Sequence, residues 1–196
     1  MSMSAASRIE NRAALPSARI GDPGTKRNPA SRDKKDLHTI SLLVRDAPGV
    51  LVRVAMVFSR RGYNIESLVV SPGARAGFSR ITATCSGDPS ILEQMIKQLA
   101  KLVDVVHALD HTLSDRFETE IALIKIRCEG EARRDVLDVA EHFNAKVVDY
   151  NIDSLILRVH GASDKLDAMI ALFEEQDVLE LVRSGKIVMA RGMEMT

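Results

Sequence analysis

The chain of 196 residues contains no tryptophan, and aromatic residues make up 4% of it. Proteins that bind single strands of nucleic acid stack bases on aromatic side chains, so this scarcity argues against that class. The formal net charge is zero, with 27 basic and 27 acidic residues. Nucleic acids and anionic membrane surfaces attract basic proteins. We therefore expect neither nucleic acid nor a membrane as a partner.

Cysteines and long apolar segments are also scarce. The two cysteines, Cys85 and Cys128, lie in apolar strand-like segments without metal-ligand spacing. We predict two buried free thiols, which are typical of a reducing cytosol, and hence a cytoplasmic protein. No apolar run approaches the roughly 20 residues that cross a bilayer. No nucleotide fingerprint or catalytic set of side chains occurs at a useful spacing, so we predict no cofactor, metal or catalytic residue in this chain.

Residues 1–36 differ from the rest of the chain. They are rich in Ala, Ser, Arg, Pro and Gly and show neither apolar period, which predicts a disordered or loosely packed tail. From Leu37 onward the apolar periodicity is strong. It indicates two domains, over residues 37–112 and 113–192.

The same order of elements occurs in both domains. The pattern predicts strands over 37–44, 64–71, 78–85, 103–109, 117–127, 145–150, 154–160 and 178–182, with a further candidate over 186–190. It predicts helices over 49–60, from an Asp88 cap to about 99, over 131–143, and from a Ser163 cap to about 175. This order is that of two tandem ferredoxin-like βαββαβ domains of the α+β class. Each sheet then has one face and one edge strand open, so we expect an edge-to-edge dimer.

The turn before the first predicted helix is the most informative feature of the chain. Asp46, Ala47, Pro48 and Gly49 lead directly into Val50 and Leu51. A glycine turn at a helix start leaves backbone N–H groups uncovered, and these groups bind a carboxylate or a phosphate. The corresponding place in the second domain has Glu131 and no glycine for close approach. We therefore place a small-anion site in the first domain, with Gly49 as a simple turn glycine being the alternative.

At this point the chain resembles a known family. The octapeptide Arg-Gly-Tyr-Asn-Ile-Glu-Ser-Leu at residues 61–68, with the turn at 46–51 and the Lys-Leu-Val-Asp-Val segment at 101–105, resembles the small regulatory subunit of acetolactate (acetohydroxyacid) synthase. The first domain resembles an ACT domain. The resemblance implies a noncatalytic subunit that stimulates the acetolactate synthase catalytic subunit. It also implies feedback inhibition by valine or another branched-chain amino acid, a homodimer through the ACT domain, and thiamine diphosphate, Mg and FAD on the catalytic partner.

The resemblance also implies where the effector binds. The first-helix turn of one chain and the asparagine-bearing strand of the other line a pocket at the dimer interface. In this sequence the residues at those places are Asp46, Gly49, Val50, Leu51, Asn64 and Ile65. The backbone near Gly49 holds the effector carboxylate, and Asn64 or Asp46 takes its ammonium group. Many family members have asparagine where Asp46 stands, so Asp46 either caps the helix or faces the ammonium.

Two alternatives stay open at this stage. The basic segment from Arg183 to Lys186 is either a plain hairpin turn or a contact for the catalytic subunit or an anion. The whole chain is either the regulatory subunit described above or a free-standing ACT-type sensor that acts on another enzyme or on a transcription factor. A helix-turn-helix with a basic face would favour a transcription factor, and the sequence pattern shows none.

Overall fold

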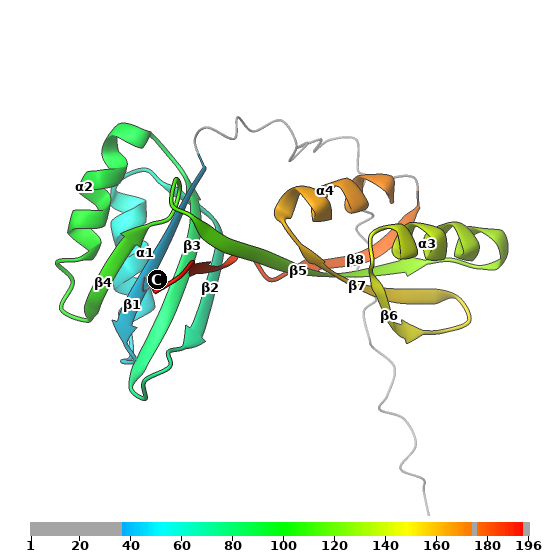
Figure 1. Cartoon of the computed structure of the whole chain (residues 1–196), viewed down its shortest axis with the longest axis horizontal. Helices are drawn as coiled ribbons and strands as arrows, with labels where there is room; N and C mark the ends of the chain where they lie inside the picture. The colour runs from blue at the N-terminus through cyan, green and yellow to red at the C-terminus, as the bar shows by residue number, and fades with distance from the viewer. Residues whose placement is uncertain (1–36, 174–175, 194–196) are drawn as a thin grey trace, which may run out of the picture.

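The two domains each form an antiparallel sheet with two helices on one face, as Figure 1 shows. The computed structural model describes residues 37–173 and 176–193, so the predicted tail lies outside the described residues. The βαββαβ order occurs twice, and the predicted α+β ferredoxin-like class is confirmed.

In the first domain the sheet has the strand order β2-β3-β1-β4, so β2 and β4 are its edges. The strands are β1 (Leu37–Arg45), β2 (Asn64–Pro72), β3 (Phe78–Ser86) and β4 (Val105–Asp110). Helix α1 (Val50–Arg60) contacts β2, and α2 (Pro89–Leu99) contacts β4. Asp88 caps α2 as predicted, because its carboxylate accepts the N–H of Ser90 at 2.9 Å.

The apolar spacing of α1 explains how it packs. Val50, Val54, Val57 and Phe58 recur on one face, and all four are buried against the sheet. After Arg60 the chain turns through Gly62, whose φ of +72° is a left-handed conformation that ends helices. The strand β2 then begins at Asn64, directly after the end of α1.

The second domain contains a longer set of strands in the order β6-β7-β5-β8, with β9 paired to β5 outside this path. The strands are β5 (Arg116–Arg127), β6 (Lys146–Tyr150), β7 (Ser154–Gly161), β8 (Asp177–Arg183) and β9 (Ile187–Ala190). Helices α3 (Gly130–His142) and α4 (Ser163–Leu172) cover one face.

Two details of the second domain correct the sequence analysis. Ser163 does not cap α4, because its hydroxyl donates to Glu120 at 2.9 Å and Ala162 takes the capping position. A glycine does stand at the start of α3, since Gly130 is its first residue with φ +55°. Arg133 lies over this helix start and donates to the carbonyl oxygens of Cys128 and Asn151, at 3.0 and 2.6 Å.

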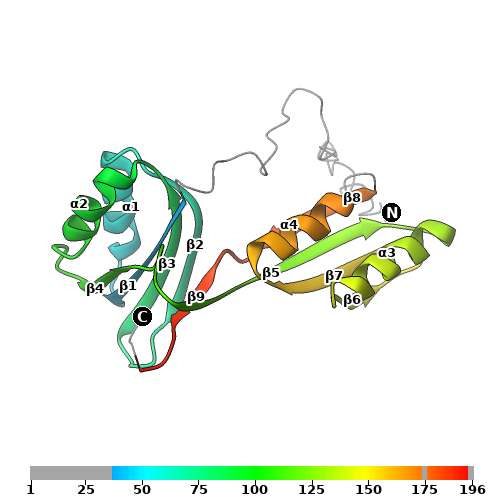
Figure 2. The same cartoon turned by 45° about the horizontal axis from the view of Figure 1, so that its top comes forward.

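Strand β5 joins the two domains. Its first four residues pair with β9, and the rest of the strand pairs with β7 and β8. We name the paired segments 116–119 and 187–190 the ribbon. Figures 1 and 2 both show β9 beside β2 and β3, on the face of the first sheet that lacks helices. The connection between β8 and β9, residues 184–186, contacts this face, because a β-carbon on Gly185 would lie 2.9 Å from the β-carbon of Ser67.

The helix-free face of the first sheet is therefore covered, and the prediction that it is open is wrong. Its polar side chains are buried although the sheet has no helix there; they are Thr39, Ser41, Thr82 and Thr84. His111, in the connection between the domains, bonds to the hydroxyl of Ser41 at 2.7 Å. On the ribbon Val188 is buried as well. A single sequence pattern could not show this cover, because the covering strand is separated from the sheet by a whole domain.

Candidate functional site

The turn before α1 has the geometry that its sequence demands. Gly49 has φ +81° and ψ −2°, and the N–H of Val50 donates to the carbonyl of Ala47 at 3.3 Å. These angles, with Pro48 before the glycine, define a type II turn, whose third position needs a positive φ. The turn therefore requires a glycine at position 49, and the helix starts immediately after it.

The start of α1 carries no side-chain cap and no acidic residue in its first turn, within the part of the chain that the structure describes. Of the two roles expected for Asp46, the helix cap is wrong, because Gly49 takes the N-cap position without a side-chain hydrogen bond. Asp46 is exposed, and its own N–H donates to the carbonyl of Gly77 at 2.9 Å. Leu51 is half exposed, whereas the side chain of Val50 is in the core. The first turn of α1 therefore offers uncapped backbone N–H groups beside one accessible apolar side chain.

Arg53 is a residue at this site that the sequence analysis did not single out. It follows Gly49 by one helical turn, and helical side chains lean toward the N-terminus. A β-carbon on Gly49 would lie 3.1 Å from Nη1 of Arg53. Asp104 holds the same guanidinium group through an ion pair of 2.5 Å. Asp104 neutralises this guanidinium group, so Arg53 offers N–H donors beside the helix start, and the attraction for an anion comes from the helix dipole.

Asn64 and Ile65 lie at the other end of α1. The helix has 11 residues, and at about 1.5 Å each its two ends are roughly 16 Å apart. A surface depression of about 440 Å³ lies at this second end, lined by Ala55, Phe58, Ser59, Gly62, Tyr63, Asn64 and Ile65. The Asn64 amide donates to the carboxylate of Glu66 at 2.8 Å. One chain therefore does not bring the Gly49 turn and Asn64 together.

Comparisons with known proteins bear on what this site belongs to. A family model described as the AHAS small subunit-like ACT domain matches residues 40–107, and one described as the small subunit of acetolactate synthase matches residues 119–192. The acetolactate synthase small subunit of Mycobacterium leprae is 41% identical over 79% of this chain and 92% of its own length. The chain belongs to the acetolactate synthase small subunit family.

Two further relatives agree with this assignment. The probable acetolactate synthase small subunit of Archaeoglobus fulgidus is 43% identical over 79% of this chain and 97% of that protein. The crystal structure of the Thermotoga maritima acetolactate synthase small subunit matches with a TM-score of 0.73 and 36% identity, over 81% of this chain and 99% of that one. The similarity to acetolactate synthase small subunits thus extends through both domains.

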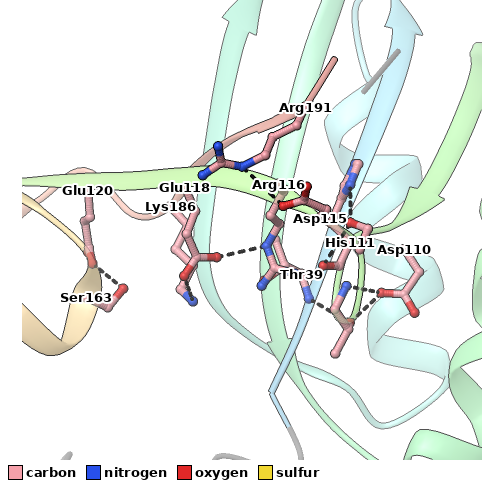
Figure 3. Close-up of polar contacts among 12 residues, drawn as sticks. Thr39, Asp110, His111, Asp115, Arg116, Glu118, Glu120, Ser163, Lys186 and Arg191 are labelled. Carbon is pink, nitrogen blue, oxygen red and sulfur yellow. Dashed lines mark hydrogen bonds and ion pairs between the residues drawn. The ribbon is translucent and has the colours of Figure 1, made fainter. Parts of the chain in front are cut away.

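The basic segment of this small subunit is engaged within the molecule. Arg183 donates to both carboxylate oxygens of Glu120, at 2.9 and 2.7 Å, and to Asp167 at 2.6 Å. Lys186 pairs with Glu118 at 3.3 Å, and Figure 3 shows this carboxylate between Lys186 and Arg116. The acidic partners neutralise both cations. The predicted hairpin turn is wrong, because β8 and β9 both run antiparallel to β5 and the chain continues in one direction through residues 184–186.

The electrostatics of Glu120 follow from this arrangement. Burial alone raises the pKa of its carboxyl group, but the hydrogen bonds and charge of Arg183 and the Ser163 hydroxyl outweigh burial. The net effect is a lowered pKa. No cluster of side chains in residues 37–173 and 176–193 has the composition of a metal site. Over the same residues, no helix is long and apolar enough to cross a membrane.

Proposed function

We propose that this small subunit is the noncatalytic regulatory subunit of an acetolactate synthase. It stimulates the catalytic subunit and makes that subunit sensitive to feedback inhibition by valine or another branched-chain amino acid. Thiamine diphosphate, Mg and FAD belong to the catalytic partner. The observation that carries the proposal is the uncapped start of α1 at one end of the helix, with Asn64 beside a depression at the other end.

A homodimer through the edge strand β2 unites these two ends. Helix α1 contacts β2, whereas α2 contacts β4. If β2 pairs antiparallel with its copy about a two-fold axis, the two α1 helices lie next to each other in opposite directions. The Gly49 turn of one chain then comes to the Asn64 end of the other, and two equivalent sites form. Pairing through β4 brings the α2 helices together instead and leaves the site divided.

Each end of α1 suits one part of a branched-chain amino acid. The N–H groups at the helix start, together with Arg53, bind the carboxylate. Leu51 of one chain and Ile65 of the other contact the branched side chain, whose burial contributes about 2 kcal/mol. One methylene changes binding by only about 1–3 kcal/mol, so valine, leucine and isoleucine compete for the site. Because two chains form the site, the effector stabilises one arrangement of the dimer and shifts the population of active complexes.

The test combines the purified chain with an acetolactate synthase catalytic subunit. Acetolactate formation is measured with and without the small subunit, and then over a range of valine concentrations. We expect stimulation without valine and inhibition with it. The variants Gly49→Asp and Asn64→Ala should still stimulate the catalytic subunit but should lose inhibition by valine. In Gly49→Asp, the new side chain blocks close approach of the effector to the backbone, and its carboxylate repels the effector carboxylate.

The matched control for the glycine variant is Gly192→Asp. Gly192 also has a positive φ, +68°, and a β-carbon there would meet nothing within 4 Å. Gly192 is also far from α1 in the sequence. This control should stay sensitive to valine. Full inhibition of both site variants would show that the effector binds elsewhere. Valine binding with no effect on the synthase in either direction would favour a free-standing sensor for another target.

A further inference from the structure

Glu66 lies between two hydrogen-bond donors at the Asn64 end of α1. The Nδ2 atom of Asn64 and the hydroxyl of Ser86 each lie 2.8 Å from the Oε1 atom of Glu66. Asn64 and Ser86 face each other across β2 and β3, and the register of these strands shifts between Ile65 and Ser67. The irregularity in β2 thus places the Glu66 carboxylate within reach of both donors.

The chemistry of the pair determines how the Asn64 amide is turned. An ionised carboxylate only accepts hydrogen bonds, whereas an amide has one donor group and one acceptor oxygen. The Asn64 nitrogen must therefore face Glu66, and its Oδ1 atom faces away from this carboxylate. We propose that Glu66 is a positioning residue that fixes the Asn64 amide, so that Asn64 presents its carbonyl oxygen to the ammonium group of the effector. This inference rests on the proposed function.

The charges at the two ends of α1 support this orientation of the ligand. The Asn64 end carries the negative charge of Glu66 and lies beside the depression that Asn64 lines. The Gly49 end carries the uncapped helix start, whose dipole attracts an anion, and the N–H donors of Arg53, whose charge Asp104 neutralises. A zwitterion held between the two ends therefore has its ammonium group at Asn64 and its carboxylate at the Gly49 turn. Charge-assisted hydrogen bonds are about twice as strong as neutral ones, so the ammonium group contributes to selectivity.

The inference predicts how the site distinguishes two ligands of nearly equal shape. L-valine has an ammonium group where (S)-2-hydroxy-3-methylbutyrate has a hydroxyl group. A fixed acceptor oxygen next to a carboxylate favours the ammonium over the hydroxyl. If the Asn64 amide were free to turn, its NH₂ group could face the ligand instead and would repel the ammonium.

The experiment is calorimetric titration of the full chain with each of the two ligands. We expect the wild type to bind valine at least about tenfold more tightly than the hydroxy acid, the size of one charge-assisted hydrogen bond. Glu66→Gln should reduce this ratio by about tenfold, since glutamine can both donate and accept. Ser86→Ala is the matched control, because it removes the other donor to the same oxygen without releasing the Asn64 amide. It should leave the ratio within about threefold of the wild type.

A double variant tests whether Glu66 acts through Asn64. Asn64→Asp with Glu66→Gln exchanges the acid and the amide, so that the new glutamine donates to the new aspartate and an acceptor oxygen again faces the ligand. We expect this exchange to restore the preference for valine relative to Glu66→Gln alone. An unchanged ratio in Glu66→Gln, or no recovery in the double variant, overturns the inference. A wild type that binds neither ligand overturns the proposed effector site itself.

Discussion

The contact between Gly185 and β2 predicts the effect of a single methyl group. Gly185 has φ +80°, and a β-carbon there would lie 2.9 Å from the β-carbon of Ser67 and 3.3 Å from Cγ2 of Val69. An L-residue in the left-handed conformation costs about 1–2 kcal/mol. The overlap with β2 adds about 1–3 kcal/mol, because both atoms belong to packed strands. We expect Gly185→Ala to lower the free energy of unfolding by about 2–5 kcal/mol.

Gly77→Ala separates the two contributions. Gly77 has a nearly identical φ, +81°, but a β-carbon there meets nothing within 4 Å. This variant should therefore lose only the conformational part, about 1–2 kcal/mol. The double variant Ser67→Gly/Gly185→Ala removes the β-carbon of Ser67. It should recover most of the stability difference between Gly185→Ala and Gly77→Ala. Urea unfolding of the four proteins, followed by circular dichroism, gives the comparison. Equal losses for Gly185→Ala and Gly77→Ala would mean that the connection between β8 and β9 does not pack on the first sheet.

Three further predictions concern buried polar groups. The pKa of Glu120 is lowered from its usual 4.5, so its pairing with Arg183 stabilises the fold above pH 4.5. This contribution is lost as the pH falls through the lower pKa of the folded state. In Glu120→Gln the free energy of unfolding, measured by urea titration at each pH, should therefore depend less on pH in this range. Burial lowers the pKa of His111 below 6.5, so below about that pH the unfolded chain takes up a proton more readily than the folded one, and the fold is destabilised. His111→Gln should remove this contribution to the pH dependence of the free energy of unfolding between pH 7.5 and 5.5. Burial raises the pKa of Cys85 to about 12, and Cys128 is buried too, so a thiol reagent should label both only after urea unfolds the chain.

The local elements could be predicted because their signals are local. The apolar spacing from Val50 to Phe58 and the glycine at 62 define α1 within one residue of the prediction. The strand predicted from 103 begins later, at Val105, because backbone hydrogen bonds from Leu102 to Leu99 and from Val105 to Leu102 form turns there. Such turns compete with a strand over the same apolar residues, and the pattern alone does not decide between them.

The contacts that cross between elements could not be predicted in the same way. Serine before a helix indicates a cap, but the buried carboxylate of Glu120, 43 residues earlier, takes the hydroxyl of Ser163. Glu66 belongs to the octapeptide that indicates the family, yet its spacing from Asn64 does not reveal a hydrogen bond. Arg53 looks like a surface cation on the helix pattern, and only the turn geometry places it beside Gly49.

The position of β9 has a consequence for biosynthesis. Residues 187–190 leave the ribosome after both helices and the other four strands of the second domain, and domains fold as they emerge, the N-terminal one first. The helix-free face of the nascent first domain therefore stays exposed to water until β9 has been synthesised. The hydroxyl groups of Thr39, Ser41, Thr82 and Thr84 can be exposed during that time, since water forms hydrogen bonds with them until β9 covers the sheet. An apolar surface exposed at this stage of folding would favour aggregation.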